Sequence, residues 1–178
     1  SNYDPLANVS VFNGGAYDNN IGSGSYFYNN QHLIFTSYGD CIIRSADIYA
    51  ENSNVITFEL RDNNGTVLDD TTHIVNPGKQ NIILNFNVPN SSDLQLGIST
   101  NNSGLYRNST GSNYPYNIGN MINITGSSAS QSGYYYFYYN IEVEARCLDV
   151  SSISHIGLYS HKKLLKVVDV LGRETKGK

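Results

Sequence analysis

Three tyrosines at alternate positions, Tyr134, Tyr136 and Tyr138, form the clearest candidate binding surface in this sequence. They lie in the stretch 134–146, which lacks Gly and Pro and is rich in aromatic and β-branched residues, and this composition predicts one long strand. Since successive side chains of a strand point to opposite faces, the three rings would share one face. A Tyr ring offers a rigid apolar face beside a hydroxyl, which suits stacking against a sugar ring.

A second group of residues lies in the long polar segment 101–120, which we expect to be a connection that borders the aromatic strand. Together the two groups make a predicted carbohydrate site, whose residues are Tyr134, Tyr136, Tyr138, Tyr106, Arg107, Tyr114 and Tyr116. The alternative is that these tyrosines fill the core of a β-protein. Solvent exposure of the alternate rings distinguishes the two interpretations, because exposed aromatic patches usually have a binding role.

Catalytic patterns find little support in the sequence. The four histidines, His32, His73, His155 and His161, do not have metal-site spacing, and the chain has neither a nucleophile-elbow motif nor a phosphate loop. Glu142 and Glu144 share a strand face, and paired carboxylates can hydrolyse glycosides, but such a pair beside Arg146 is more typical of a solvated surface. We therefore predict that the chain is not an enzyme, although it can be the accessory module of a larger secreted hydrolase.

No cofactor is predicted, and a structural Ca²⁺ remains an open alternative. Calcium takes roughly six to eight oxygen ligands from several segments, and the candidate carboxylates are Asp18, Asp40, Asp62, Asp69 and Asp70. Asp62 opens the turn sequence 62–65 and is more typical of a turn residue. The two cysteines, Cys41 and Cys147, fit either a disulfide between two strand ends or two separate thiols.

Composition and charge exclude several classes of protein. Charged residues make up only 15% of the 178 residues while Tyr (15) outnumbers Phe (6), which excludes a disordered chain. Residues 1–147 contain five Lys/Arg and 12 Asp/Glu, a balance of −7, so no basic patch predicts a nucleic-acid partner. Residues 148–178 contain six Lys/Arg and three Asp/Glu, a balance of +3. No apolar run approaches the roughly 20 residues that span a bilayer.

Short alternating segments separated by turns predict the fold. Residues 54–61 alternate with Ile56, Phe58 and Leu60 inward and with Thr57, Glu59 and Arg61 outward, and segments 80–88 and 94–98 alternate in the same way. Asp62–Gly65 predicts a hairpin turn, and segment 26–35 a first strand or hairpin. The fold class we predict is all-β: an antiparallel two-sheet β-sandwich, jelly-roll-like, with a short C-terminal β appendage.

The C-terminal residues carry the most specific motif. Lys163–Glu174, with the core Asp169-Val-Leu-Gly-Arg173, resembles the type A sorting domain that the type IX secretion system of Bacteroidota reads, and 156–160 resembles that domain's first strand. The family's later strands have no counterpart before Lys178, so we expect a truncated sorting domain. The resemblance implies export through the secretion machinery, and then a secreted or outer cell-surface location.

With the segments Gly104–Asn108, Tyr114–Tyr116 and the Tyr-rich stretch 134–146, residues 24–147 resemble the β-sandwich modules that come before such sorting domains, and these modules have the layout of carbohydrate-binding modules. We therefore expect three parts: a β-sandwich domain with a polar N-terminal lead-in over 1–147, a linker over 148–152, and a partial sorting domain over 153–178. The expected function is an extracellular, non-catalytic binding module for a glycan or surface polysaccharide. The alternative is a structural or adhesive spacer domain of a larger surface protein or assembly.

Overall fold

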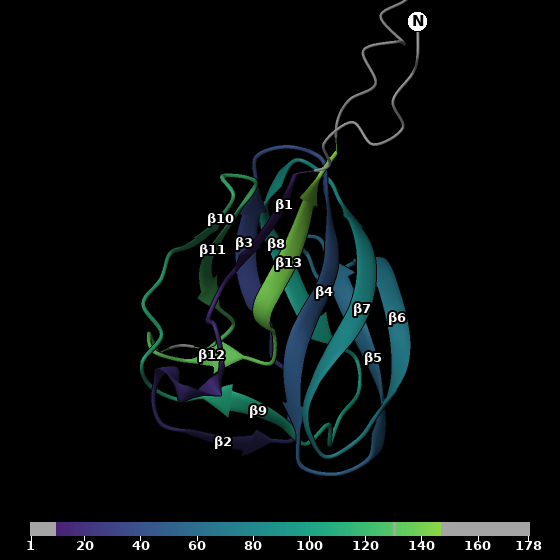
Figure 1. Ribbon diagram of the computed structural model, residues 1–178, viewed down its shortest axis with the longest axis vertical. Helices are drawn as coiled ribbons and strands as arrows, with labels where there is room; N and C mark the ends of the chain where they lie inside the picture. Colours follow the sequence, from purple (N-terminus) through teal and green to yellow (C-terminus); the bar gives the residue numbers. More distant parts are fainter. Residues whose placement is uncertain (1–9, 130, 147–178) are drawn as a thin grey trace, which may run out of the picture. The chain divides into compact units, whose positions relative to one another are not determined.

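The predicted strands pair into two antiparallel sheets in the computed structural model, which describes residues 10–129 and 131–146 (Figure 1). The first sheet contains β1 (Val11–Gly14), β13 (Tyr139–Ala145), β4 (Cys41–Ala50), β9 (Leu105–Asn108) and β12 (Tyr135–Tyr136), with β7 (Gly78–Val88) beside β4 and β2 (Gly24–Phe27) beside β9. The second contains β10 (Tyr116–Ile118), β11 (Ile122–Ser127), β3 (Leu33–Ser37), β8 (Ser91–Ile98), β5 (Asn54–Arg61) and β6 (Val67–Val75). A short 3-10 helix, η1 (Asn19–Ile21), precedes β2. The prediction of an antiparallel two-sheet sandwich is confirmed.

The strands pair as in one long hairpin whose successive strand pairs belong to the two sheets in turn. β5 pairs with β6 in the second sheet, β4 with β7 in the first, and β3 with β8 in the second again. These nested antiparallel pairs alternate between the two sheets around the turn at Asp62–Gly65. Such alternation is the pairing pattern of a jelly roll, as the sequence led us to expect.

The core consists of the inward faces that the alternation predicted. Each of the side chains predicted to point inward from β5, β7 and β8 is at most 5% exposed: Ile56, Phe58, Leu60, Ile82, Leu84, Phe86, Val88, Leu94, Leu96 and Ile98. Burial of apolar area of this kind is the main driving force for folding. The two-residue period of the local sequence is therefore enough to predict which side chains of these three strands point inward.

The predicted hairpin turn between β5 and β6 also forms. The Asp62 carboxylate accepts hydrogen bonds from the backbone N–H groups of Asn64 and Thr66, each at 2.8 Å, and Gly65 has a φ of +84°. These backbone donors lower the pKa of the Asp62 carboxyl, because they stabilise its charged form. Asp62 is thus a turn residue.

Two connections differ from the prediction. β2 and β3 belong to different sheets, so segment 26–35 is neither a single strand nor a hairpin. The polar residues between them carry the chain from one sheet to the other. The segment 101–120, predicted as an unbroken connection, contains β9 and β10, which are too short to show an alternating pattern.

The most important difference is in the aromatic stretch, which is two strands in place of one. Phe137 has a φ of +67°, and the backbone N–H of Tyr138 bonds to the Tyr136 carbonyl, so the chain turns sharply between β12 and β13. The alternation of faces is lost across this turn. Every residue from Tyr135 to Tyr139 is consequently buried, at 3% exposure or less.

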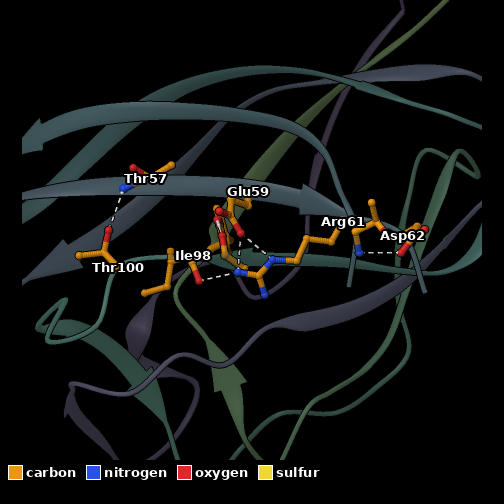
Figure 2. Close-up of polar contacts among 9 residues, drawn as sticks. Thr57, Glu59, Arg61, Asp62, Ile98 and Thr100 are labelled. Carbon is orange, nitrogen blue, oxygen red and sulfur yellow. Dashed lines mark hydrogen bonds and ion pairs between the residues drawn. The ribbon is translucent and has the colours of Figure 1, made fainter. Parts of the chain in front are cut away.

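The outward face of β5 is also covered, although the sequence predicted that Glu59 and Arg61 would face solvent. Arg61 donates through Nε to Glu59 Oε2 (2.6 Å) and through Nη2 to the Ile98 carbonyl (2.6 Å), as Figure 2 shows. A Cβ built on Gly97 would lie 3.2 Å from Arg61 Nη1 and 3.0 Å from the His32 Cβ. The absence of a side chain at Gly97 therefore makes room for this ion pair beneath the segment that holds His32.

His32 gives this region a pH dependence. Burial, and secondly the charge of Arg61, lower the pKa of the His32 imidazole below its ordinary value of 6.5. The unfolded chain then binds a proton that the folded chain excludes, so stability should be retained above pH 6.5 and should fall as the pH drops below it. Urea unfolding of the wild type and of His32→Gln at pH 7.5 and pH 5 measures this, and the variant should lose less stability. Equal losses in both proteins would contradict the prediction.

The predicted linker, the sorting-like segment and Cys147 lie outside the described residues. Cys41 is fully buried at the start of β4, where it lies opposite Ala145 of β13. Across residues 10–129 and 131–146, no helix has the length and apolar character needed to cross a membrane.

Candidate functional site

A cavity of about 450 Å³ lies beside the three short strands β2, β9 and β12. In Figure 1 these strands run crosswise below β13 and to the left of the lower ends of β4 and β7. The cavity is lined by residues from these strands and from the loops that follow β2 and β11: Phe27, Gln31, Arg107, Ser128, Ala129, Gln131, Tyr134 and Tyr136. The volume of this cavity is within the range of small-ligand sites.

Strand pairing positions the central residue of this cavity. On β9, Arg107 lies opposite Ser25 of β2 and opposite Tyr136 of β12, so β9 is the middle strand of the three. The next residue, Asn108, is fully buried; its amide donates to the carbonyls of Asn19 (2.9 Å) and Gly22 (3.0 Å). These buried bonds hold β9 in register and fix where the Arg107 side chain begins.

Aromatic rings hold the Arg107 guanidinium. Its Cζ lies over the Phe27 ring and over the Tyr134 ring, 4.6 Å from each ring centre. Both contacts have cation–π geometry, which stabilises a positive charge by roughly 0.5–2 kcal/mol. Tyr136 packs on both rings, with centroid distances of 5.7 Å to Phe27 and 6.1 Å to Tyr134. Burial raises the pKa of the Tyr136 hydroxyl and the Arg107 charge opposes that rise, so the phenol is neutral at pH 7.

Polar side chains from the loops after β2 and β11 also line the cavity. The Ser128 hydroxyl donates to Oε1 of Gln31 and accepts the backbone N–H of His32 at 3.0 Å. This arrangement connects the loop after β11 to the loop after β2, and it leaves the Gln31 side-chain amide N–H groups as donors at the cavity. Gln131 is exposed and adds a second amide to the lining.

The structure brings three of the seven predicted site residues together at the cavity: Tyr134, Tyr136 and Arg107. Tyr106 contacts Tyr26 and Tyr49. Tyr114 and Tyr116 pack on Tyr135, with centroid distances of 6.1 Å and 5.5 Å, and burial raises the pKa of the Tyr114 hydroxyl. Tyr138 lies in the core against Phe58.

The expectation of an exposed row of alternate tyrosines is therefore wrong. Tyr138 is fully buried and its hydroxyl donates to the Gly97 carbonyl, while Tyr136 is 3% exposed and stacks on Tyr134. The turn at Phe137 is the physical reason, because it ends the two-residue alternation that the row requires. Tyr134 and Tyr136 therefore form part of the wall of a cavity, and Tyr138 belongs to the core.

Sequence reasoning missed five lining residues: Phe27, Gln31, Ser128, Ala129 and Gln131. Phe27 lies in a strand of only four residues, and the other four lie in loops. Loop residues do not show a periodic pattern, so nothing in the sequence indicated that these two distant segments would meet.

The acidic side chains of the described residues lie apart from one another. Within residues 10–129 and 131–146, no three His, Cys, Asp or Glu side chains gather as metal ligands would. Several of the Asp carboxylates proposed for Ca²⁺ accept backbone N–H groups: Asp18 that of Asn20, Asp40 that of Asn90, Asp62 those of Asn64 and Thr66, and Asp69 that of Asn87. Glu144, from the carboxylate pair of β13, is ion-paired with Arg44.

Searches among known protein families, curated proteins and solved structures find nothing that matches this chain. The residues of the cavity and their chemistry are therefore the features that indicate a function.

Proposed function

We propose that this chain is an extracellular, non-catalytic carbohydrate-binding module and that the cavity beside β2, β9 and β12 is its binding site. The observation that carries the proposal is the composition of the lining. Aromatic rings from two strands and polar side chains from two loops converge on one cavity of about 450 Å³. Sugars need this combination, because a pyranose has apolar C–H faces and a rim of hydroxyls.

The polar residues of the lining are suited to hydroxyl recognition. Gln31 and Gln131 are amides that can donate and accept, and Ser128 holds Gln31 in place by a hydrogen bond. A sugar hydroxyl also donates and accepts, so neutral amides match it without the desolvation cost of a charged group. The described residues of the lining do not include a carboxylate pair, so they favour binding over hydrolysis.

The extracellular part of the proposal is supported by the resemblance of Lys163–Glu174 to a type A sorting domain. These residues lie outside the described part of the chain, so export by type IX secretion stays a prediction. A glycan-binding module and a sorting segment are compatible in one secreted chain, since the module binds the ligand and the segment directs export.

The proposal is tested with the full chain on a glycan array and in pull-down assays with insoluble polysaccharides, each with and without EDTA. Saturable binding to at least one sugar class is expected. Binding that EDTA abolishes would add Ca²⁺ to the site. The absence of binding across a broad panel would overturn the proposal and favour the structural or adhesive role.

Replacing Tyr134 by Ala should weaken glycan binding about tenfold or more, because the ring is a half-buried wall of the cavity and holds Arg107. Isothermal titration with a ligand found on the array measures the effect. Tyr38→Ala is the matched control, since Tyr38 is 57% exposed and does not line the cavity. Equal affinities of the two variants would place the sugar elsewhere on the molecule.

The fold should survive this substitution. The Tyr114 hydroxyl bonds to the backbone carbonyl of Tyr134 at 2.7 Å, and Ala keeps that acceptor. The thermal midpoint should therefore fall by only a few degrees, which corresponds to about 1 kcal/mol in a domain of this size.

A further inference from the structure

The Arg107 guanidinium is a positive charge with unmet hydrogen-bonding needs. Its Nε and Nη1 atoms are buried, and neither has a hydrogen-bond partner among the described residues. An unpaired buried donor is destabilising, and more so when it is charged. Native proteins rarely leave such groups unpaired unless a water, an ion or a ligand supplies the acceptor.

The other basic side chains of the described residues have the partners that Arg107 lacks. Arg44 is bonded to Glu144, Arg61 to Glu59, Lys79 to Asp47 and Arg146 to Asn87. None of the described residues that line the cavity is acidic. Arg107 is thus a cation without a charged partner. The charge at the cavity is positive, whereas residues 1–147 carry a net charge of −7.

The contacts that hold the guanidinium in place matter as much as its charge. The Phe27 and Tyr134 rings hold it by cation–π contact, and its strand is held in turn by the buried Asn108. A guanidinium that is already fixed loses little conformational entropy on binding, which raises affinity. Nη2 is not among the buried unpaired atoms of Arg107, so it is the donor that can reach a carboxylate oxygen of a ligand in the cavity, in a charge-assisted hydrogen bond.

We propose that the cavity selects an acidic sugar and that Arg107 binds its carboxylate, while Gln31 and Gln131 bind its hydroxyls. The ligand class is a uronic acid unit of a polysaccharide. This inference rests on the proposed carbohydrate-binding function and specifies its ligand. Neutral sugars would satisfy the amides but would leave the guanidinium donors without a charged acceptor.

The test is isothermal titration of the full chain with short oligomers of galacturonate, glucuronate, mannuronate and guluronate. Each is paired with its carboxyl-reduced, neutral counterpart. A preference of about 10- to 100-fold for at least one charged oligomer is expected, since a hydrogen bond to a charged group contributes that much to affinity. This comparison uses the wild type alone, so it does not depend on whether a variant folds.

Arg107→Gln should lower the ratio of charged-oligomer affinity to neutral-oligomer affinity to about one, and Arg107→Lys should restore part of that ratio. Arg44→Gln is the control, because it removes a positive charge that does not line the cavity, and it should leave the preference unchanged. Wild-type binding that is equal for charged and neutral oligomers would overturn the acidic-sugar inference and leave the proposed function standing. The absence of binding to every sugar would overturn both.

Discussion

Replacing Tyr138 by Ala should reduce the free energy of unfolding by about 3–5 kcal/mol, the usual cost of removing a buried aromatic side chain. Tyr138 is fully buried, its ring lies 5.8 Å from that of Phe58, and its hydroxyl donates to the Gly97 carbonyl across the sandwich. Since whole domains are stable by only about 5–15 kcal/mol, the variant should be near its limit of stability. Urea unfolding monitored by far-UV circular dichroism measures the loss.

Two further variants make this result interpretable. Tyr138→Phe keeps the ring and removes only the hydroxyl, so its cost should be about 1–2 kcal/mol. Tyr17→Ala removes a ring that is 75% exposed and should change stability by less than about 0.5 kcal/mol. A Tyr138→Ala protein that kept its stability but lost glycan binding would show that the ring is a binding surface and not part of the core.

Replacing Glu59 by Leu should cost about 3–5 kcal/mol, because it leaves the charge of Arg61 buried without its partner. The side chains of the pair are only 11% and 12% exposed, and Arg61 is tied in addition to the Ile98 carbonyl (Figure 2). The same unfolding experiment at pH 7 measures the effect.

The double variant Glu59→Leu/Arg61→Met removes both charges and should recover most of the loss, to within about 1 kcal/mol of the wild type. Glu144→Gln is the matched control: the Glu144 side chain is 14% exposed, but its partner Arg44 is 39% exposed and can be solvated when the pair is broken, so the loss should be about 1 kcal/mol. If both single variants lost the same small amount, the Glu59–Arg61 pair would be solvated in solution.

Local sequence pattern was enough to predict the fold class and most of the core. The inward faces of β5, β7 and β8 follow from a period of two residues, which is a local property of the chain. The turn at Asp62–Gly65 follows from residue types that cap backbone N–H groups and tolerate positive φ. Both signals are contained in a few neighbouring residues, so no long-range contact had to be known.

The sequence also singled out Arg107, Tyr134 and Tyr136, but for a reason that the structure changes. Their residue types indicated sugar recognition on an exposed row of rings. The structure places all three at one cavity, where the rings hold the guanidinium, and it moves Tyr138 from the expected row into the core.

The shape of the candidate site depends on contacts between distant parts of the chain. The positive φ of Phe137 breaks the aromatic stretch, and that backbone conformation is stabilised by packing on both sides, which no periodicity encodes. Gln31 and Ser128 meet across 97 positions of sequence because β3 pairs with β11, and Arg107 acquires its two rings because β9 lies between β2 and β12. Strand pairings over such separations depend on the whole chain, whereas patterning and turn chemistry are local.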